Sequence, residues 1–521
     1  MKKIYLFLMS AALLAGFSSC NDELETAPTN AISGPTVFGD AKNAESTING
    51  IYRILHTPGW SSNWASENIG HAGNILVADL MGEDHLMAAQ GQGWFYEDYR
   101  LNVHGDYTHT SGRSYALWNF YYTIIANANY IIGNQIGGSP TLADEIYGQA
   151  YAIRAWAYFY LAQFYAKSPD KYGDTPGVPY YDQPTLAGTE GKARGTVNEI
   201  YAHMRDDIDK AIEYLAKEKN QKNLTHIDYY TAQGIKARIA LVQRDYDAAI
   251  EAAKEAMTKP GCGVLEVAKF TPMTKAASNW MWGAIIQIAD QASNYMSYLS
   301  HMDADYPGHY AEKANQCIST GLYKLISGDT RRSAWWEGAF SSRKYNQKKY
   351  VGTTEDYAAS GTGDICYMRY EEMILIKAEA ECAKGQFDAV KTTLAELMDK
   401  RNPKWLETFD GKGKEGETGY IKPLEKSAMY NTVDANVAPE TVMDYILLQR
   451  RVELWSEAGR VFDLNRLHIG YNRKYTGSNH TQTVEDKNTD ADSPLFILPL
   501  PQREIDGNEN ISASDNNEIV Q

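Results

Sequence analysis

Cysteine is scarce in this sequence. Its 521 residues include five cysteines, which are Cys20, Cys262, Cys317, Cys366 and Cys382, and no two of them are close in sequence. This spacing excludes the paired cysteines of a zinc ribbon or a dithiol redox centre. It also argues against a small disulfide-held scaffold, because a chain of this length can bury a large hydrophobic core. The four later cysteines permit disulfides without requiring any.

Acidic residues outnumber basic ones, 66 to 50. Long apolar runs are also missing beyond the N-terminus. The net charge of −16 argues against nucleic acid and anionic lipid surfaces as partners. Every apolar stretch after the N-terminal one is interrupted by charged residues. No later segment is therefore expected to span a membrane.

The N-terminus has the parts of an export signal. Lys2 and Lys3 precede an apolar run over residues 4–17, and two serines then come directly before Cys20. The run is shorter than the ~20 residues that cross a bilayer. This order of a basic region, an apolar region and small residues predicts a lipoprotein signal peptide.

The predicted signal sets the domain boundaries. We predict a signal peptide over residues 1–19, lipid attachment at Cys20, a flexible acidic tether over residues 20–33, and a single domain over residues 34–521. The alternative is an ordinary secretory peptide that is cut near Ser19, with no lipid.

Sequence signatures of common catalytic sites are also missing. The chain has no His-Glu-x-x-His, no Gly-x-Ser-x-Gly and no phosphate-binding loop motif. Adjacent carboxylates such as Glu371 and Glu372 fall on predicted helices, where neighbours point in different directions, so we interpret them as solvated groups or ion-pair partners. The sequence leaves open the two separated carboxylates of a glycosidase.

One short segment has residue types that ligate metals. His301, Asp303, Asp305 and His309 lie close together in the sequence. Glycine and proline between them favour a solvated loop instead. We expect no metal site here.

Helical periodicity dominates much of the chain. Residues 228–259 and 367–401 each read as two antiparallel helices with small residues at their contact and a proline soon after. This is the pattern of a tetratricopeptide hairpin, and an unrelated helical bundle is the alternative. A third candidate pair covers residues 141–168 and 197–218.

Irregular segments separate the helices. Residues 58–110 are rich in glycine, asparagine, histidine and tryptophan and predict long loops, and residues 265–360 mix aromatic loops with a buried strand expected at 283–288. Loops on a rigid scaffold often carry binding function. The chain has 37 tyrosines and 11 tryptophans, so these loops are candidates for ring-stacking surfaces.

Several stretches together resemble one family. They are residues 149–155 followed by the Tyr-Gly-Asp-Thr-Pro turn at 172–176, residues 369–380, residues 450–466 and residues 498–505. With Cys20 they are similar to the SusD/RagB lipoproteins, in that family's order from end to end. We interpret the matched side chains as structural, because Arg460, Asp463 and Arg466 can pair along one helix. Pro499 and Pro501 predict an extended segment that packs on the scaffold.

The resemblance implies a fold and a function. The fold class would be mainly α, a tetratricopeptide-like scaffold of helical hairpins (the SusD-like α-α superhelix) with an irregular, loop-rich ligand-binding face and little β structure. The function would be non-catalytic binding of oligo- or polysaccharides at the cell surface and delivery to a TonB-dependent transporter of the SusC/RagA type. The chain would be lipid-anchored in the outer membrane, facing the cell exterior. No cofactor, metal or nucleic acid is implied, and the sequence gives no support for a structural calcium ion.

The resemblance also directs the search for binding residues to the two loop regions. Sugar rings present apolar C–H faces edged by hydroxyls, so binding needs flat aromatic rings and nearby polar groups. The candidates are Trp60, Trp64, Trp94, Tyr96, Tyr295, Tyr298 and Tyr306, with Asp84 and Asn294 as polar partners. The Trp94-Phe95-Tyr96 group and Tyr295 are the first choices. Further candidates are Tyr99, Tyr310, Trp335, Trp336, Asn63, Asp79, Glu83, Asp303 and Arg343.

Three alternatives remain open. A peptide or glycopeptide ligand, as in the RagB branch, would use the same scaffold. A glycoside hydrolase is less favoured, and a purely structural adaptor for the transporter would bind no ligand in isolation.

Overall fold

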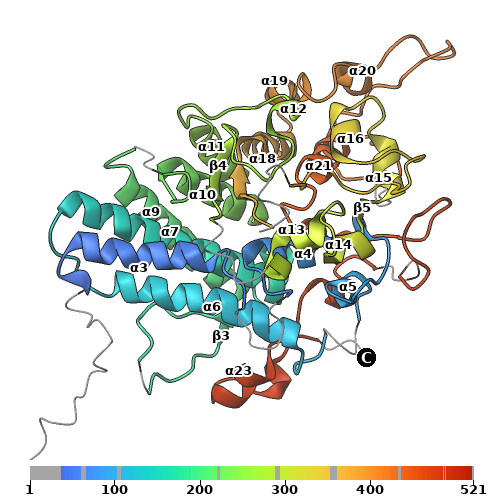
Figure 1. Ribbon diagram of the computed structural model, residues 1–521. Helices are drawn as coiled ribbons and strands as arrows, with labels where there is room; N and C mark the ends of the chain where they lie inside the picture. The colour runs from blue at the N-terminus through green and yellow to red at the C-terminus, as the bar shows by residue number, and fades with distance from the viewer. Residues whose placement is uncertain are drawn as a thin grey trace, which may run out of the picture.

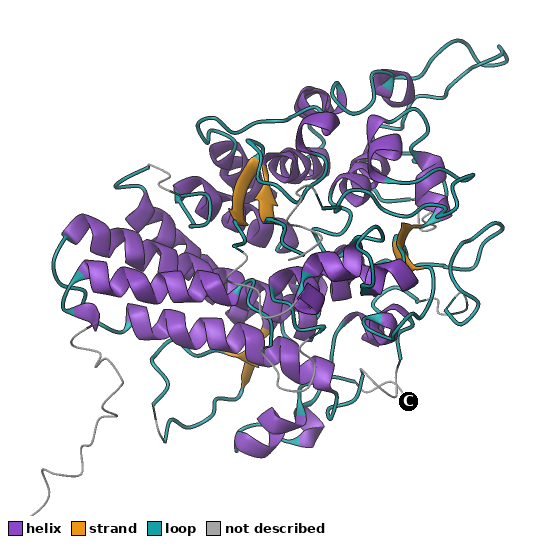
Figure 2. Ribbon diagram, viewed as in Figure 1, coloured by secondary structure: helices purple, strands orange, loops and turns teal. Residues whose placement is uncertain are grey.

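The computed structural model describes residues 37–59, 66–102, 107–186, 188–219, 223–287, 294–352, 361–431, 436–484, 486 and 489–518. The predicted signal peptide, the tether and Cys20 lie outside these residues. Helices dominate the described chain, and its strands form small two-stranded sheets (Figure 2). The predicted mainly α fold class is confirmed.

Long helices lie side by side at one end of the molecule (Figure 1). They are α3 (Ala41–Ile54), α6 (Gly112–Ile132), α7 (Pro140–Tyr165) and α9 (Val197–Leu215). Helix α7 contacts α3, α6 and α9. Each of α7 and α9 begins at a hydroxyl N-cap, Ser139 and Thr196, and the Thr196 hydroxyl and the Glu199 carboxylate form a reciprocal capping box. Helices α7 and α9 are the third helix pair expected from the sequence.

A glycine sets how closely α7 and α9 approach. A Cβ atom added to Gly148 would lie 2.6 Å from Cγ of Leu215 and 3.1 Å from Cβ of Tyr214. Both atoms are close to the backbone of α9. The absence of a side chain at position 148 therefore permits this helix contact.

The two predicted hairpins are also present. They are α10 (Tyr229–Val242) with α11 (Tyr246–Ala256), and α18 (Tyr370–Ala383) with α19 (Phe387–Met398). Helix α11 packs on α18, so the hairpins stack, and α21 (Val442–Glu453) covers the other side of α18. The turn between α18 and α19 passes through Gly385 at a φ of +71°, where a glycine is favoured.

Short antiparallel strand pairs join distant segments. Strand β4 (Trp280–Ala284) pairs with β6 (Ile365–Arg369), β1 (His85–Met87) with β5 (Gln316–Ile318), and β2 (Pro176–Pro179) with β3 (Arg194–Thr196). The expected strand at 283–288 was placed too late, because the buried run Trp280–Met281–Trp282 pairs with β6 and the pairing ends at Ala284. Trp282 lies in the core.

The remaining elements are short. They are α4 (His71–Leu80), α5 (Tyr96–Tyr99), α8 (Pro169–Tyr172), α12 (Val267–Phe270), α13 (Tyr298–Met302), α14 (Tyr310–Lys313), α15 (Thr320–Leu325), α16 (Thr330–Trp335), α20 (Trp405–Phe409), α22 (Arg460–Leu467), α23 (Gln502–Gly507) and the 3₁₀ turns η2 (Asn294–Met296), η3 (Pro494–Phe496) and η4 (Ala513–Asp515). Helix α4 corrects the expectation of loops throughout residues 58–110. It is buried almost all round, so its sequence lacks the polar stripe by which a surface helix is recognised.

The residues that carried the family resemblance are structural, as interpreted. Arg450 and Arg466 both donate to the buried Asp463 carboxylate, at 2.9 and 2.7 Å, and Arg460 pairs with Glu83 at 2.8 Å. The adjacent carboxylates Glu371 and Glu372 are likewise buried ion-pair partners. These pairs fix the relative positions of helices that are far apart in the sequence.

The C-terminal segment, residues 495–517, is extended at Pro501, with a φ of −70° and a ψ of 146°, and packs on the scaffold, as predicted. The Leu498 backbone N–H donates to the Phe164 carbonyl at 2.7 Å, and Gln502 N–H donates to the His109 carbonyl at 2.6 Å. The Ser114 hydroxyl donates to the Pro499 carbonyl. This segment therefore connects the N-terminal part of α6 to the C-terminal part of α7.

No helix in the described part of the chain is long and apolar enough to cross a lipid bilayer.

Candidate functional site

Five aromatic side chains from distant segments meet in one cluster. This cluster, termed the aromatic platform, consists of Trp94, Tyr295, Tyr306, His309 and Tyr310. The ring centroids of Trp94 and Tyr310 lie 6.0 Å apart, and those of Tyr310 and Tyr295 lie 5.6 Å apart. Tyr295 is 46% exposed, while Trp94 and Tyr310 are half-buried. Of the first choices, Trp94 and Tyr295 therefore lie in one cluster, joined by Tyr310, whereas Phe95 and Tyr96 are buried.

Inner rings support the exposed ring of the platform. Tyr306 and His309 stack with a centroid distance of 3.5 Å, and the His309 ring lies 4.5 Å from Tyr295. Both inner rings are buried, and burial lowers the pKa of His309. The stacked rings of Tyr306 and His309 hold Tyr295 in place, and neither ring places a charge next to it.

A second layer fixes Tyr310 and Trp94. The buried His301 ring stacks on Tyr310 at 4.6 Å and meets the edge of Phe95 at 4.8 Å. Burial lowers the pKa of His301 to about 3, so the ring is neutral and its Nε2–H donates to the Ser66 carbonyl at 2.6 Å. This layer packs against the half-buried Tyr310 and against Phe95, the chain neighbour of Trp94.

The chain beside Trp94 is held in an uncommon conformation. Phe95 has a φ of +60°, in the left-handed region that larger residues rarely adopt. Its backbone N–H donates to Glu67 at 2.6 Å, and Arg113 pairs with Glu67 and Asp98, both at 2.8 Å. This buried ion-pair network compensates the local strain and sets the direction of Trp94.

Polar groups border the platform. Asp305 is exposed and pairs with Arg343 at 2.6 Å, and the Tyr310 hydroxyl donates to Ser66 Oγ at 3.2 Å. Asp303 is buried and accepts from the backbone N–H groups of Asp305 and Gly352, each at 2.8 Å. Asp305, the chain neighbour of Tyr306, thus forms an exposed ion pair with Arg343, and Asp303 holds the loop through backbone hydrogen bonds.

Other predicted residues are directed into the interior. Tyr96 is buried, and its hydroxyl contacts Thr483 at 2.7 Å. The Tyr298 hydroxyl meets Ser456 Oγ at 3.0 Å. Asp84 is buried against Arg451 at 2.6 Å. The prediction that these three residues bind ligand is corrected, because each side chain makes structural contacts in the interior. Tyr96 and Tyr298 begin the short helices α5 and α13, and Asp84 directly precedes strand β1. Tyr306 belongs to the platform only as a supporting ring.

The remaining candidates divide into buried and undescribed residues. Trp60, Asn63 and Trp64 lie outside the described residues, and Asn294 begins η2 with a side chain that the structure does not describe. Buried in the core or in ion pairs are Asp79, Glu83, Tyr99, Trp335 and Trp336.

The interpretation of residues 301–309 as a solvated loop was wrong. His301, Asp303 and His309 are buried, because the histidine rings complete the aromatic stack. Within the described ranges, no group of three or more His, Cys, Asp or Glu side chains is arranged to hold a metal ion. The sequence analysis missed His309 as a platform member and His301 as a ring that supports the platform, although their spacing next to Tyr306 and Tyr310 offered a signal.

Comparison with known proteins identifies relatives of this fold. A family model described as "Starch-binding associating with outer membrane" matches residues 72–241, and a model described as "SusD family" matches residues 319–517. Together they cover more than half of the chain. No curated protein matches the sequence.

Solved structures resemble the chain over most of its length. A SusD-like carbohydrate binding protein from Bacteroides vulgatus is 21% identical with a TM-score of 0.74, and the match covers 92% of this chain and 98% of that one. A SusD superfamily protein from Bacteroides thetaiotaomicron is 20% identical with a TM-score of 0.72, over 92% and 100% of the two chains. Surface glycan-binding protein A from Bacteroides fluxus is 17% identical with a TM-score of 0.62, over 90% and 97%.

At these identities the structural matches establish the shared fold, and the two family models establish descent. The chain belongs to the SusD/RagB family.

Proposed function

We propose that this protein binds glycans at the cell surface and delivers them to a TonB-dependent transporter of the SusC/RagA type, without chemical change to the glycan. The observation that carries the proposal is the aromatic platform, in which Trp94, Tyr295 and Tyr310 come together on a SusD/RagB scaffold. The family description and the names of two structural relatives support a carbohydrate ligand.

The platform suits a sugar ring for a physical reason. The exposed Tyr295 face can cover the apolar C–H face of a pyranose, while Asp305 and Arg343 can hydrogen-bond its hydroxyls at the edge. Water competes for the same hydrogen bonds, so each contributes only about 1 kcal/mol net. Affinity therefore depends on stacking and on contacts with several sugar units, which favours oligosaccharides over monosaccharides.

The carboxylates beside the platform have structural partners. Asp303 accepts backbone N–H groups, Asp305 pairs with Arg343, and Glu312 accepts the Gly308 N–H at 2.8 Å. A glycosidase requires two carboxyl groups placed across the scissile bond. The partners of these carboxylates support binding without catalysis.

The proposed location rests on Cys20 and the residues around it. A lipid on Cys20 followed by a flexible acidic leader would let the folded body move over a transporter while it stays attached to the outer membrane. A neighbouring gene for a TonB-dependent transporter would support this location, and neighbouring hydrolase genes would indicate the glycan.

The binding test uses alanine substitutions in the platform. The purified protein, Tyr295→Ala and Trp94→Ala are titrated with a panel of neutral oligosaccharides and, separately, with peptides. Loss of one stacking ring removes roughly 1–2 kcal/mol of apolar contact, so we expect affinity for the bound glycan to fall about 5- to 30-fold. Tyr130→Ala is the matched control, because Tyr130 is 38% exposed on α6 and lies outside the platform.

The same titrations separate the alternatives. Unchanged glycan affinity in both platform variants would contradict the site. Binding of peptides alone would favour a peptide or glycopeptide carrier, and shortened oligosaccharides detected by mass spectrometry would identify a hydrolase. A protein that binds no panel member but co-purifies with a transporter would be a structural adaptor.

A further inference from the structure

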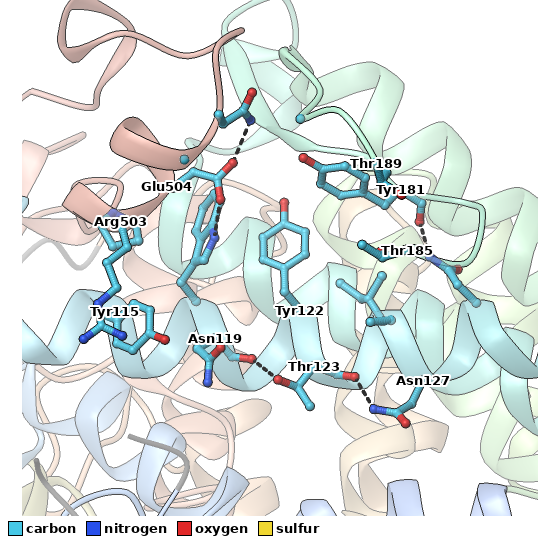
Figure 3. A pocket seen from close by; sticks show the side chains of 18 of the residues that line it. Tyr115, Asn119, Tyr122, Thr123, Asn127, Tyr181, Thr185, Thr189, Arg503 and Glu504 are labelled. Carbon is cyan, nitrogen blue, oxygen red and sulfur yellow. Dashed lines mark hydrogen bonds between the residues drawn. The ribbon is translucent and has the colours of Figure 1, made fainter. Parts of the chain in front are cut away.

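A cavity lies along α6, away from the platform. This α6 groove has a volume of about 540 Å³ and is bounded by α6, the segment between β2 and β3, and α23. Figure 3 shows Tyr122 pointing into the space between Glu504 and Tyr181. The volume falls within the ~300–1,000 Å³ usual for ligand sites.

The groove and the platform lie on opposite sides of α6. Near its start, α6 directs Arg113 toward Phe95, with the guanidinium 5.3 Å from the ring centroid, beside the platform. Tyr122 follows nine residues later, which at ~100° per residue is half a turn away from Arg113. Figure 1 agrees, with α13 and α14 above α6 and α23 below it. The α6 groove is therefore a separate site.

Helical spacing gives the groove two parallel rows of side chains. Tyr115, Trp118 and Tyr122 follow one another at steps of three and four and form an aromatic row. Asn119, Thr123 and Asn127 form a second row at steps of four. The second row extends ~12 Å along the helix axis at ~1.5 Å per residue. Such a pairing offers the partly exposed rings of Tyr115 and Tyr122, supported by the buried Trp118, beside hydrogen-bonding oxygens over more than one sugar unit.

The aromatic row is fixed before any ligand arrives. Trp118 Nε1–H donates to Glu504 at 3.3 Å, and Asn508 holds the other oxygen of that carboxylate at 2.7 Å. The Tyr122 hydroxyl donates to the Pro179 carbonyl at 2.7 Å, and the ring lies 4.8 Å from Trp118 and 5.9 Å from Tyr181. Fixed rings lose little entropy on binding, which is the condition for a useful stacking surface.

The second row presents acceptors. Thr123 Oγ donates to the Asn119 carbonyl at 2.7 Å, and Asn127 Nδ2 donates to the Thr123 carbonyl at 2.8 Å. Both side chains use a donor on the helix itself, so the Thr123 hydroxyl oxygen and the Asn127 amide oxygen remain oriented as acceptors (Figure 3). Sugar hydroxyls are the donors that such a row would accept.

The charge of the lining favours a neutral ligand. Its charged side chains are Arg503, Glu190 and Glu504, and Arg503 lies over the Tyr115 ring at 4.1 Å. Glu504 is occupied by Trp118 and Asn508. A polyanion would meet two carboxylates here, and a polycation would meet an arginine.

We infer that the α6 groove is a second binding site for a neutral oligosaccharide, on the opposite side of α6 from the platform. The inference rests on the proposed glycan-binding function and adds a separate subsite that holds a second segment of a polysaccharide or a second chain.

The test measures stoichiometry. The full protein is titrated by calorimetry with a neutral oligosaccharide that it binds, and the expected stoichiometry is two. The groove variant Tyr115→Ala/Asn127→Ala and the platform variant Trp94→Ala/Tyr295→Ala should each bind one, and the combined variant none. Thr185→Trp, which fills the groove from an exposed position, gives an independent variant, and Tyr130→Ala is the control on the same helix.

Each other outcome has a distinct meaning. One site that is lost only in the platform variant overturns the groove and retains the proposed function. One site that is lost only in the groove variants overturns the platform and retains the groove. No glycan binding at all overturns both. Groove variants with unchanged stoichiometry but weaker co-purification with a transporter show that the groove holds a protein segment and overturn the glycan assignment.

Discussion

Glu453 lies in the interior with arginines on several sides. Its carboxylate accepts from Arg331, Arg369 and Arg401, all at 2.9 Å, and all four side chains are fully buried. Surrounding arginines hold the pKa of Glu453 well below its usual range, against the opposing effect of burial. The carboxylate therefore stays ionised and neutralises charges contributed by three separate segments.

Removal of that charge should be costly. Glu453→Gln removes a negative charge that three buried guanidinium groups share, and their remaining carboxylate partners compensate them only in part. We therefore expect the free energy of unfolding to fall by about 3–5 kcal/mol. Urea unfolding, followed by circular dichroism, measures the free energy of unfolding of the variant and of the unaltered protein. Asp486→Asn is the control, because Asp486 and its partner Lys474 are exposed and such a pair contributes roughly 0–1 kcal/mol. Equal small effects of the two substitutions would contradict a structural role for the cluster.

Single residues show where sequence reasoning reaches its limit for the site. Trp94 and Tyr295, predicted in two separate loop regions, lie in one cluster, whereas Tyr96 and Asp84 face inward. A sequence gives residue type, but the side on which a residue points in a short helix or an irregular loop depends on contacts with distant segments. Tyr295 and Tyr306 have the same chemistry, and tertiary packing alone makes one exposed and the other buried.

Among the elements, the long helices were the predictable part. Helices α7, α9, α10, α11, α18 and α19 were found because apolar and small residues repeat with a helical period over ten or more residues. Helix α4 and the start of β4 were missed, since both are buried on all sides and have no alternation to detect. In the sequence, α4 precedes the loop that carries Trp94, and β4 precedes the loop that carries Tyr295.

Two helical glycines provide a matched test of helix packing. Gly50 in α3 has open space where a Cβ would stand, so Gly50→Ala should stabilise the protein by about 1 kcal/mol through helix propensity. Gly148→Ala in α7 gains the same propensity but pushes a methyl group into Leu215 and Tyr214. Overpacking that costs roughly 1–3 kcal/mol should make its net effect destabilising.

Thermal and urea unfolding of both variants measure the difference. We expect Gly50→Ala to raise the free energy of unfolding and Gly148→Ala to lower it. Two stabilising substitutions would mean that α9 moves away from α7 without penalty, and that close packing of this pair is not required.

At the scale of the whole molecule, buried histidines couple stability to pH. Burial lowers the pKa of His85, His301 and His480 to about 3 and that of His71 well below its ordinary value. These groups stay neutral in the folded protein, but in the unfolded chain they bind protons below about pH 6.5. Stability should therefore be constant with respect to these groups above pH 6.5 and decrease as the pH falls below it.

A single substitution can test how much one histidine contributes to the change of unfolding free energy with pH. Each such histidine contributes about 1.4 kcal/mol per pH unit below pH 6.5. Between pH 6 and pH 5, His480→Gln should reduce the pH slope of the unfolding free energy by this amount, because glutamine can still bond Tyr99 and the Glu83 carbonyl. Urea titrations at several pH values check it, and an identical slope in the variant would show that His480 is already protonated in the folded state.

The position of the C-terminal segment also sets an order in time. Phe164 and His109 receive their backbone partners from residues 498 and 502, more than three hundred residues later in the chain. During synthesis, which proceeds from the N-terminus at ~5–20 residues per second, the ends of α6 and α7 must wait for these partners until nearly the whole chain has been made. The helical hairpins can form early, but the native core closes late. For most of the time that synthesis takes, α6 and α7 therefore lack their contacts with the C-terminal segment.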